Sequence, residues 1–447
     1  ETLKLAGKDP DFNRRDMWES IEMGDYFEWE LGVQVVEEAD EHKFDFDLLD
    51  PTKIIPEELV PVQKLGKMTL SRNPDNFFAE TEQAAFHIGH IVPGIDFSND
   101  PLLQGRLFSY TDTQLLRLGG PNFHEIPINR SIAPVHNNQR DAFHRQTINK
   151  GRANYEPNSV DSGWPKETPP AASGGGFESY PERMEGHKVR ARSPSFGDHF
   201  SQATLFWNSM STPEKEHIIG AYSFELGKVE RVFIRERQVN EILANIDLEL
   251  ARRVAENIGV TPPTAPTMSL KQPTPASSPA LSLMNHLSGN IKSRKVAILI
   301  ANGVDGDAIE AFKQKLADEG AMAKLIGPSP APVKTADGKM LTPDAAMDGM
   351  PSIAFDAVFV PGGAQSVQAM AKNGVAKHYL LEAYKHLKPI AVLGEARQLL
   401  TALNLPEDAG LVTGDSGDVA TVFSAFAQAL SQHRVWAREA AAEQVPA

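Results

Sequence analysis

The pattern of apolar and polar positions differs between the two ends of the chain. Residues 29–36 and 44–48 alternate between apolar and polar side chains, which is the period of a strand with one buried face. Residues 295–300 instead form a nearly continuous apolar run, typical of a buried strand in a parallel sheet. We therefore expect the last strands of one sheet near the start of the chain and a covered parallel sheet near its end.

The last third of the chain alternates between predicted strands and helices. After the apolar run, a helix is expected at 307–319, and it should stop at Gly320. Further strands are expected at 323–326, 357–360 and 389–393. Because strand–helix alternation implies a doubly wound sheet, we assign residues 293–447 to a separate α/β domain.

Composition divides the remaining residues into four regions, at 1–62, 63–211, 212–259 and 260–292. The first is strand-like and rich in turns. The second is long, irregular and rich in Pro, Asn and Gly, with one convincing helix, and such a segment is expected to wrap over another surface. The third is predicted to be helical between Pro213 and Gly259, and the fourth is a Pro/Ser/Thr linker. Together these regions predict a protein of the α+β class.

Charge and composition exclude several classes of partner. The 447 residues carry a formal net charge of −15 and no basic tract, which argues against nucleic acid. No apolar run approaches the roughly 18 residues that span a membrane, and the absence of cysteine excludes disulfides and thiol chemistry and suits a reducing cytoplasm. The chain begins at Glu1 with strand-like sequence, so we expect the natural start of the protein to lie before it.

One predicted helix, at 100–119, carries candidate chemistry. It has Asp100 as a cap, Pro101 in its first turn and a Gly-Gly stop. Along it, one face presents four polar or ionisable side chains spaced i, i+4, i+8 and i+11: Arg106, Tyr110, Gln114 and Arg117. One interpretation is structural: Tyr110 lies at the edge of the core, and the charged ends of Arg106 and Arg117 extend into water. A functional interpretation is that Tyr110 binds ferric iron as a phenolate, which the guanidinium of Arg106 would favour.

Residues 106–114 resemble the signature around the proximal heme ligand of the heme catalases, in which a tyrosine is the axial ligand. Residues 72–80, 82–86, 91–95 and 122–123 resemble the same family, and the resemblance covers roughly residues 1–258 without a break. The added α/β domain is similar to the C-terminal extension of the large-subunit branch.

The resemblance implies a homotetrameric, cytoplasmic enzyme that disproportionates hydrogen peroxide to water and oxygen and so protects against oxidative stress. Residues 1–62 would be the end of the family's antiparallel β-barrel. Tyr110 would bind the iron of heme, either heme b or heme d, and Arg106, Gln114 and Arg117 would contact this cofactor, Arg117 through a propionate. The distal histidine and asparagine would precede Glu1. We interpret the other nearby candidates as loop residues: His124, His136, Asn137, Asn138 and His144.

His87 occupies a position at which large-subunit relatives can carry a histidine joined through a ring nitrogen to the β-carbon of the ligand tyrosine. The resemblance therefore implies a bond between His87 and Tyr110. The alternative is an ordinary packed histidine. Ile88 departs from the proline that relatives lead us to expect here. Gln114 differs from the basic residue common in the small-subunit branch and fits the large-subunit branch.

The C-terminal domain resembles the flavodoxin-like, class I glutamine amidotransferase-like fold at residues 360–363 and 393–396. The nucleophilic cysteine of that family would stand at the turn after a strand, and Gly394 is found there instead. Without a thiol there is no acyl-transfer chemistry. We therefore expect a structural role for this domain.

Two rival functions remain open. One is a catalase-related heme protein that acts on lipid hydroperoxides, which could share Arg106 and Tyr110. The other is a non-catalytic interaction protein on a catalase scaffold.

Overall fold

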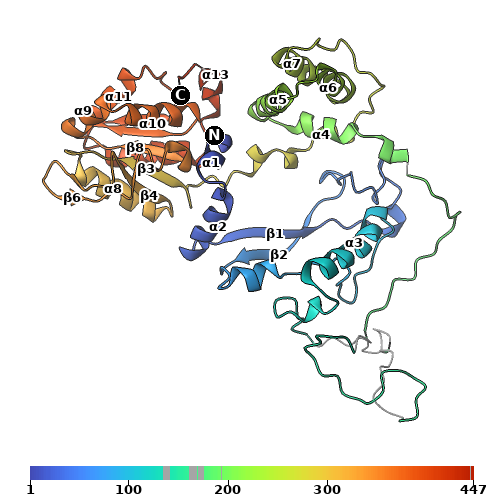
Figure 1. Ribbon diagram of the computed structural model, residues 1–447. Coiled ribbons are helices and arrows are strands. Elements are labelled where there is room, and N and C mark those ends of the chain that lie inside the picture. Colours follow the sequence, from blue (N-terminus) through green and yellow to red (C-terminus); the bar gives the residue numbers. More distant parts are fainter. Residues whose placement is uncertain (134–140, 161–168, 170–175, 193, 443, 447) are drawn as a thin grey trace.

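The computed structural model describes residues 1–133, 141–160, 169, 176–192, 194–442 and 444–446. Figure 1 shows an N-terminal part built around a hairpin and one long helix, a small helical bundle, and a layered C-terminal domain. The loop candidates His136, Asn137 and Asn138 lie outside the described residues.

The first residues are helical, which corrects the expectation that the chain opens on strands. They form α1 (Thr2–Lys8) and α2 (Phe12–Glu22). The expected strand follows as β1 (Phe27–Val33). Residues 44–48 are not a strand, although they alternate, because the rings of Phe44 and Phe46 pack on each other with centroids 5.4 Å apart.

The partner of β1 is a strand that the sequence pattern did not predict, β2 (Gln63–Leu70). The two strands are antiparallel and pair from Phe27 with Leu70 to Val33 with Gln63. Nearly every residue of both strands is exposed or half-buried, so no apolar face marks β2 in the sequence. Cross-strand ion pairs support the pairing, with Lys64 Nζ 2.7 Å from Glu30 and Lys67 Nζ 2.9 Å from Glu28.

The predicted helix of the second region is confirmed as α3 (Pro101–Leu118). The carboxylate of Asp100 accepts a hydrogen bond from the amide of Leu102 at 2.8 Å, and Gly119 ends the helix with a φ of +81°. A further helix, α4 (Ser201–Ser209), was not predicted, so this region is less irregular than expected.

The helical bundle consists of α5 (Thr212–Gly227), α6 (Val232–Arg237) and α7 (Leu248–Ile258). Ser211 and Glu214 form a capping box at the start of α5, and Gly259 ends α7 with a φ of +69°. The expected start and end of this helical region are therefore confirmed. The helices bury an apolar core of their own, which includes Val239, Leu243, Leu250 and Val254.

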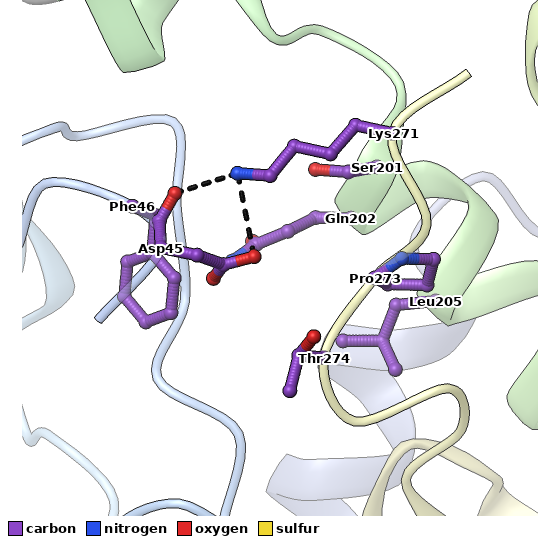
Figure 2. Close-up of a pocket in the computed structure, with 8 residues that line it drawn as sticks. All are labelled: Asp45, Phe46, Ser201, Gln202, Leu205, Lys271, Pro273 and Thr274. Carbon is purple, nitrogen blue, oxygen red and sulfur yellow. Dashed lines mark hydrogen bonds and ion pairs between the residues drawn. The ribbon is translucent and has the colours of Figure 1, made fainter. Parts of the chain in front are cut away.

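The Pro/Ser/Thr composition of residues 260–292 predicts a flexible linker. In the structure, the linker is instead bonded to other parts of the chain. Lys271 Nζ donates to the carbonyl of Asp45 at 2.6 Å and lies 3.3 Å from its carboxylate. Ser278 donates to Glu58 at 2.9 Å, and Ser282 donates to Glu214 at 2.8 Å. The hollow beside Lys271 in Figure 2 has a volume of only about 10 Å³, which is room for one water molecule and not for a substrate.

The C-terminal domain contains a six-stranded parallel sheet in the order β10-β9-β8-β3-β4-β7. Its strands are β3 (Lys295–Leu299), β4 (Met322–Gly327), β7 (Ala345–Ala346), β8 (Ala357–Val360), β9 (Ile390–Leu393) and β10 (Leu411–Gly414). The four predicted strands are confirmed, whereas β7 and β10 are short and were missed. A small hairpin of β5 (Val333–Lys334) and β6 (Met340–Leu341) lies beside the sheet.

Helices cover both faces of this sheet (Figure 1). They are α8 (Gly306–Asp318), α9 (Ala364–Lys372), α10 (Gly374–Lys385), α11 (Arg397–Ala402), α12 (Val419–Ser431) and α13 (Glu439–Ala442). Alternate residues of β3 enter opposite cores: Val296 and Ile298 pack with residues of α8 and α12, and Ala297 and Leu299 with residues of α9, α10 and α11. This double burial explains the continuous apolar run.

The first residues of the chain are attached to the C-terminal domain by ion pairs. Glu1 lies 2.6 Å from Lys388, whose side chain is fully buried. Lys4 lies 3.0 Å from Glu382, and Asp16 lies 2.5 Å from Lys295. The domain therefore contacts the N-terminal part directly as well as through the linker.

Candidate functional site

The structure brings Arg106 and Tyr110 together on one face of α3. A guanidinium nitrogen of Arg106 donates to the phenol oxygen of Tyr110 at 3.2 Å, and the guanidinium carbon lies 5.1 Å from the centre of the ring. Both side chains are half-buried. The arrangement places a guanidinium group next to the phenol oxygen.

Residues 82–90 lie along the same face of the helix. The ring of Phe86 meets that of Tyr110 edge-on, with centroids 5.6 Å apart and planes at 71°. Tyr110 is therefore in contact with an aromatic edge and with a guanidinium. Phe86 lies within residues 82–86, which resemble the heme catalases. Its contact with Tyr110 could not be predicted, because the two residues are far apart in the sequence.

Gln114 and Arg117 bind the backbone of this segment. Gln114, which is buried, donates to the carbonyl of Phe86 at 2.9 Å. Arg117 donates to the carbonyl of Ala84 at 2.9 Å and also to that of Glu82. These bonds hold residues 82–86 against α3 and do not test the expected contacts of Gln114 and Arg117 with a cofactor, which stay a prediction.

Both ring nitrogens of His87 take part in hydrogen bonds. Nδ1 accepts from the amide of Gly89 at 2.8 Å, so the ring proton is on Nε2, which lies 2.6 Å from the hydroxyl of Thr111. That hydroxyl donates onward to the carbonyl of Leu107 at 3.1 Å. The structure therefore brings His87 next to the predicted partner, Tyr110, through a hydrogen bond to the following residue, Thr111.

Two more histidines lie near His87. The ring of His90 stacks on that of His87, with centroids 4.7 Å apart. Burial, followed by the positive charges of His87 and His124, lowers the pKa of His90. His124 lies 3.4 Å from Arg145, which in turn is paired with Glu125 at 3.3 Å. These contacts support the interpretation of His124 as a structural residue.

The donor set restricts how iron could be held here. Within the described part of the chain, no group of three or more His, Cys, Asp or Glu residues could bind a metal ion. Tyr110 offers a single oxygen as a ligand. The ring of Phe86, which is 65% exposed, lies beside it. One phenol oxygen next to an apolar side chain fits a flat cofactor that supplies the remaining iron ligands itself.

Gly394 lies at the turn after β9, as the strand prediction implied. Gly394 has a φ of +53°, and a side chain built there would overlap the hydroxyl of Ser416. The next residue, Glu395, accepts a hydrogen bond from the amide of Gly363 at 3.2 Å. Its own backbone amide and that of Gly363 lower the pKa of this carboxyl. Neither Ser416 nor Glu395 was predicted from the sequence.

Three family models match the chain in succession. The model described as catalase matches residues 1–162, the model described as catalase-related immune-responsive matches residues 193–258, and the model of the C-terminal domain found in long catalases matches residues 292–440. Together they follow the order of regions seen in the structure.

Curated relatives match over the whole chain. Catalase HPII of Pseudomonas aeruginosa is 64% identical over 449 residues, and catalase HPII of Pseudomonas putida is 64% identical over 448 residues, each covering 100% of this chain and 62% of the relative. Catalase-B of Dictyostelium discoideum is 53% identical over 448 residues, and the match covers 100% of this chain and 64% of that relative. The chain thus spans somewhat less than two thirds of the length of these relatives.

Proposed function

Because this chain belongs to the catalase family, in its branch of long catalases, we propose that it is part of a heme enzyme that disproportionates hydrogen peroxide to water and oxygen and so protects against oxidative stress. The observation that carries the proposal is the Arg106–Tyr110 pair on α3, 3.2 Å apart, within a chain that is 64% identical to catalases throughout. The oxidised and reduced partners of the reaction are two molecules of hydrogen peroxide.

In this proposal Tyr110 holds the heme iron through its phenolate oxygen. The heme would supply the redox chemistry. Arg106 donates a hydrogen bond to this oxygen and so fixes its position. Phe86 packs against the ring edge-on and limits its rotation, which orients the oxygen.

The bond between His87 and Tyr110 remains part of the proposal. The His87 ring is fixed beside the helix by the amide of Gly89 and the hydroxyl of Thr111. Because both ring nitrogens are engaged, a bond to the β-carbon of Tyr110 requires one of these hydrogen bonds to be exchanged. Forming the bond would break one C–H bond at the β-carbon of Tyr110 and the N–H bond of the His87 ring, and hydrogen peroxide, reduced to water, would take up the two electrons and two protons released.

We also propose finer assignments for the fold. The hairpin of β1 and β2 would be the end of the antiparallel β-barrel, where its exposed strands would meet the rest of that sheet. The C-terminal domain would be a flavodoxin-like, amidotransferase-like domain with a structural role, since Ser416 occupies the space beside Gly394. In line with relatives of its branch, the protein would be a cytoplasmic homotetramer. Among the described residues, no helix is long and apolar enough to cross a membrane.

Oxygen evolution tests the proposal. Purified, heme-containing protein is given hydrogen peroxide in an oxygen electrode and, separately, a lipid hydroperoxide whose loss is followed by absorbance. Oxygen release from hydrogen peroxide is expected. Turnover of the lipid hydroperoxide alone would favour the catalase-related rival, and turnover of neither substrate would favour a non-catalytic scaffold.

A further inference from the structure

The hydroxyl of Thr111 connects His87 to the helix that carries the proposed iron ligand. Nε2 of His87 lies 2.6 Å from Thr111 Oγ1. Among the described residues, this is the only hydrogen bond that links His87 to α3. Thr111 directly follows Tyr110 in the chain. The contact therefore holds the imidazole ring within one residue of the tyrosine to which it is proposed to bond.

Two observations assign the ring proton of His87 to the same nitrogen. Thr111 Oγ1 donates its own hydrogen to the carbonyl of Leu107 at 3.1 Å, and a carbonyl can only accept. The hydroxyl oxygen is therefore free only to accept, so the hydrogen shared with His87 belongs to Nε2. On the other side of the ring, the amide of Gly89 donates to Nδ1 at 2.8 Å, which requires a lone pair there. The ring is thus assigned one tautomer, with its lone pair on Nδ1.

A hydroxyl group suits this ring both before and after a bond to Tyr110 forms. A C–N bond between Nδ1 and the β-carbon would use the Nδ1 lone pair, break one C–H bond at that carbon and release the proton of Nε2. Hydrogen peroxide, reduced to two molecules of water, would take up the two electrons and two protons. Nε2 would then hold a lone pair. The hydroxyl of Thr111 could turn away from Leu107 and donate to it, because a hydroxyl both donates and accepts.

We propose that Thr111 is a positioning residue for the bond between His87 and Tyr110, an inference that rests on the proposed heme enzyme and its peroxide substrate. Its hydroxyl orients the ring beside α3 and keeps the proton on Nε2. The Nδ1 lone pair is then left for the β-carbon once the amide of Gly89 is released. Valine has nearly the shape of threonine but neither donates nor accepts, so it would keep the packing and lose this control.

Thr113 offers a matched control on the same helix. Its hydroxyl donates to the carbonyl of Ser109 at 2.8 Å, which is the same one-turn bond that Thr111 makes to Leu107. Within the described part of the chain, the Thr113 hydroxyl has no hydrogen bond to a histidine. Thr113→Val therefore removes a comparable hydroxyl from α3 and leaves the contacts of His87 as they are.

Quantitative mass spectrometry of tryptic digests tests the proposal. Unmodified protein, Thr111→Val, Thr111→Ser and Thr113→Val are each purified with heme and exposed to hydrogen peroxide for set times. The fraction of branched peptide joining His87 to Tyr110 is then counted in the heme-containing protein. We expect Thr111→Val to form this peptide about threefold to tenfold more slowly, the effect of losing one neutral hydrogen bond. Thr111→Ser restores the hydroxyl and should restore the rate, and Thr113→Val should match the unmodified protein.

Equal rates in Thr111→Val and in unmodified protein would overturn the proposal. A Thr111→Ser variant as slow as Thr111→Val, or an equal loss in Thr113→Val, would overturn it as well. If unmodified protein forms no branched peptide, this inference fails, whereas its oxygen evolution still decides the proposed function separately. Should Thr111→Val not retain heme, Thr111→Ala takes its place with the same expected result.

Discussion

At the scale of single residues, Tyr110 is held by two side chains that act on different parts of it. Arg106 reaches the phenol oxygen at 3.2 Å, and Phe86 meets the ring edge-on at 5.6 Å. The guanidinium donates a hydrogen bond to the oxygen, and the aromatic contact restrains the ring. The proposed iron ligand is therefore fixed in both respects by residues of this chain.

Replacing Tyr110 by phenylalanine tests this assignment most directly. The variant keeps the ring and its contact with Phe86 but removes the only proposed ligand oxygen. We expect loss of most bound heme, measured by its absorbance per protein, and loss of essentially all oxygen evolution. Tyr155→Phe, at an exposed tyrosine, is the matched control. Full heme content with normal turnover in the Tyr110 variant would contradict the assignment.

Arg106→Ala should have a milder effect than loss of the tyrosine. The phenol oxygen remains, but it loses its hydrogen-bond donor and the adjacent positive charge. We expect heme to stay bound, with lower activity and an altered absorbance spectrum. An unchanged spectrum would show that Arg106 does not act on the ligand oxygen.

The proposed bond between His87 and Tyr110 has a simple chemical signature. Trypsin cleaves after Arg106, so it separates His87 from Tyr110 unless a covalent bond joins the two peptides. We expect mass spectrometry of a digest to show one branched peptide, and two linear peptides for His87→Ala. Two linear peptides in active unmodified protein would rule the bond out.

At the scale of elements, α3 and residues 82–90 form one unit. The helix places Gln114 and Arg117 at successive positions along its face, and both donate to backbone carbonyls of the segment, at 2.9 Å to Phe86 and 2.9 Å to Ala84. Since Phe86 and His87 lie on the segment, these bonds also position the two residues that flank Tyr110 and Thr111. The order of the site thus depends on contacts one and two turns away from it.

Arg117→Ala should loosen this unit without removing the ligand. Two carbonyls lose a charged donor, which should cost about 1–3 kcal/mol of stability. We expect faster amide hydrogen exchange in residues 84–90, measured by mass spectrometry, with most heme still bound. Arg130→Ala, at an exposed arginine, is the control. Unchanged exchange in the Arg117 variant would mean that the segment is held by its other contacts.

At the scale of the whole molecule, the C-terminal domain is joined to the rest at several separate places. Residues 1–16 reach it through ion pairs with Lys388, Glu382 and Lys295. On the helical bundle, His217 lies 2.5 Å from Glu439. Contacts this far apart in the sequence restrain the domain more than a flexible linker would.

Deletion of residues 293–447 should therefore lower the stability of the protein more than its turnover per heme. The ion pairs and the apolar surface that the domain covers would be lost, whereas α3 would keep all its contacts. We expect lower resistance to heat and protease, or a lower yield of assembled protein, with turnover per heme largely retained in the assembled fraction. Collapse of turnover per heme in an intact assembly would contradict a structural role.

Mild acid should lower the stability of the C-terminal domain through protonation of His433. Burial, with the positive charges of Arg434 and Arg294, lowers the pKa of His433 to about 4. An unfolded histidine titrates near about 6.5, so between these pH values the unfolded state binds a proton that the folded state does not. This contribution to stability is present above about pH 6.5 and is lost as the pH falls toward about 4; because the ring is partly exposed, solvent screening reduces it to roughly 1–2 kcal/mol.

His433→Asn should remove this pH dependence. Asparagine tolerates the φ of +65° found at this position, so the backbone need not change. Urea midpoints at pH 7 and pH 4.5 measure the effect, with His42→Asn, at an exposed histidine, as the control. A midpoint that falls equally in the His433 variant and in the unmodified protein would assign the acid sensitivity to other groups.

Local sequence determined the elements whose signals are short-range. The cap at Asp100 and the stop at Gly119 define α3, and the double burial of 295–300 defines β3, because each depends on residues close together in the chain. Helical spacing also placed Arg106 and Tyr110 on one face, and their contact at 3.2 Å follows from it. The resemblance, not the periodicity, gave that pair its chemical meaning.

Only the tertiary structure decided which distant residues meet. β2 exists because it pairs with β1, and no apolar period marks it in the sequence. The folded chain also brings the carbonyls of Ala84 and Glu82 within reach of Arg117, which its spacing along the helix did not predict. His87 meets Thr111, and Ser416 fills the space beside Gly394, for the same reason. Hydrogen-bond partners and steric neighbours depend on distances between segments far apart in the chain, and these distances are set by the folding of the whole chain.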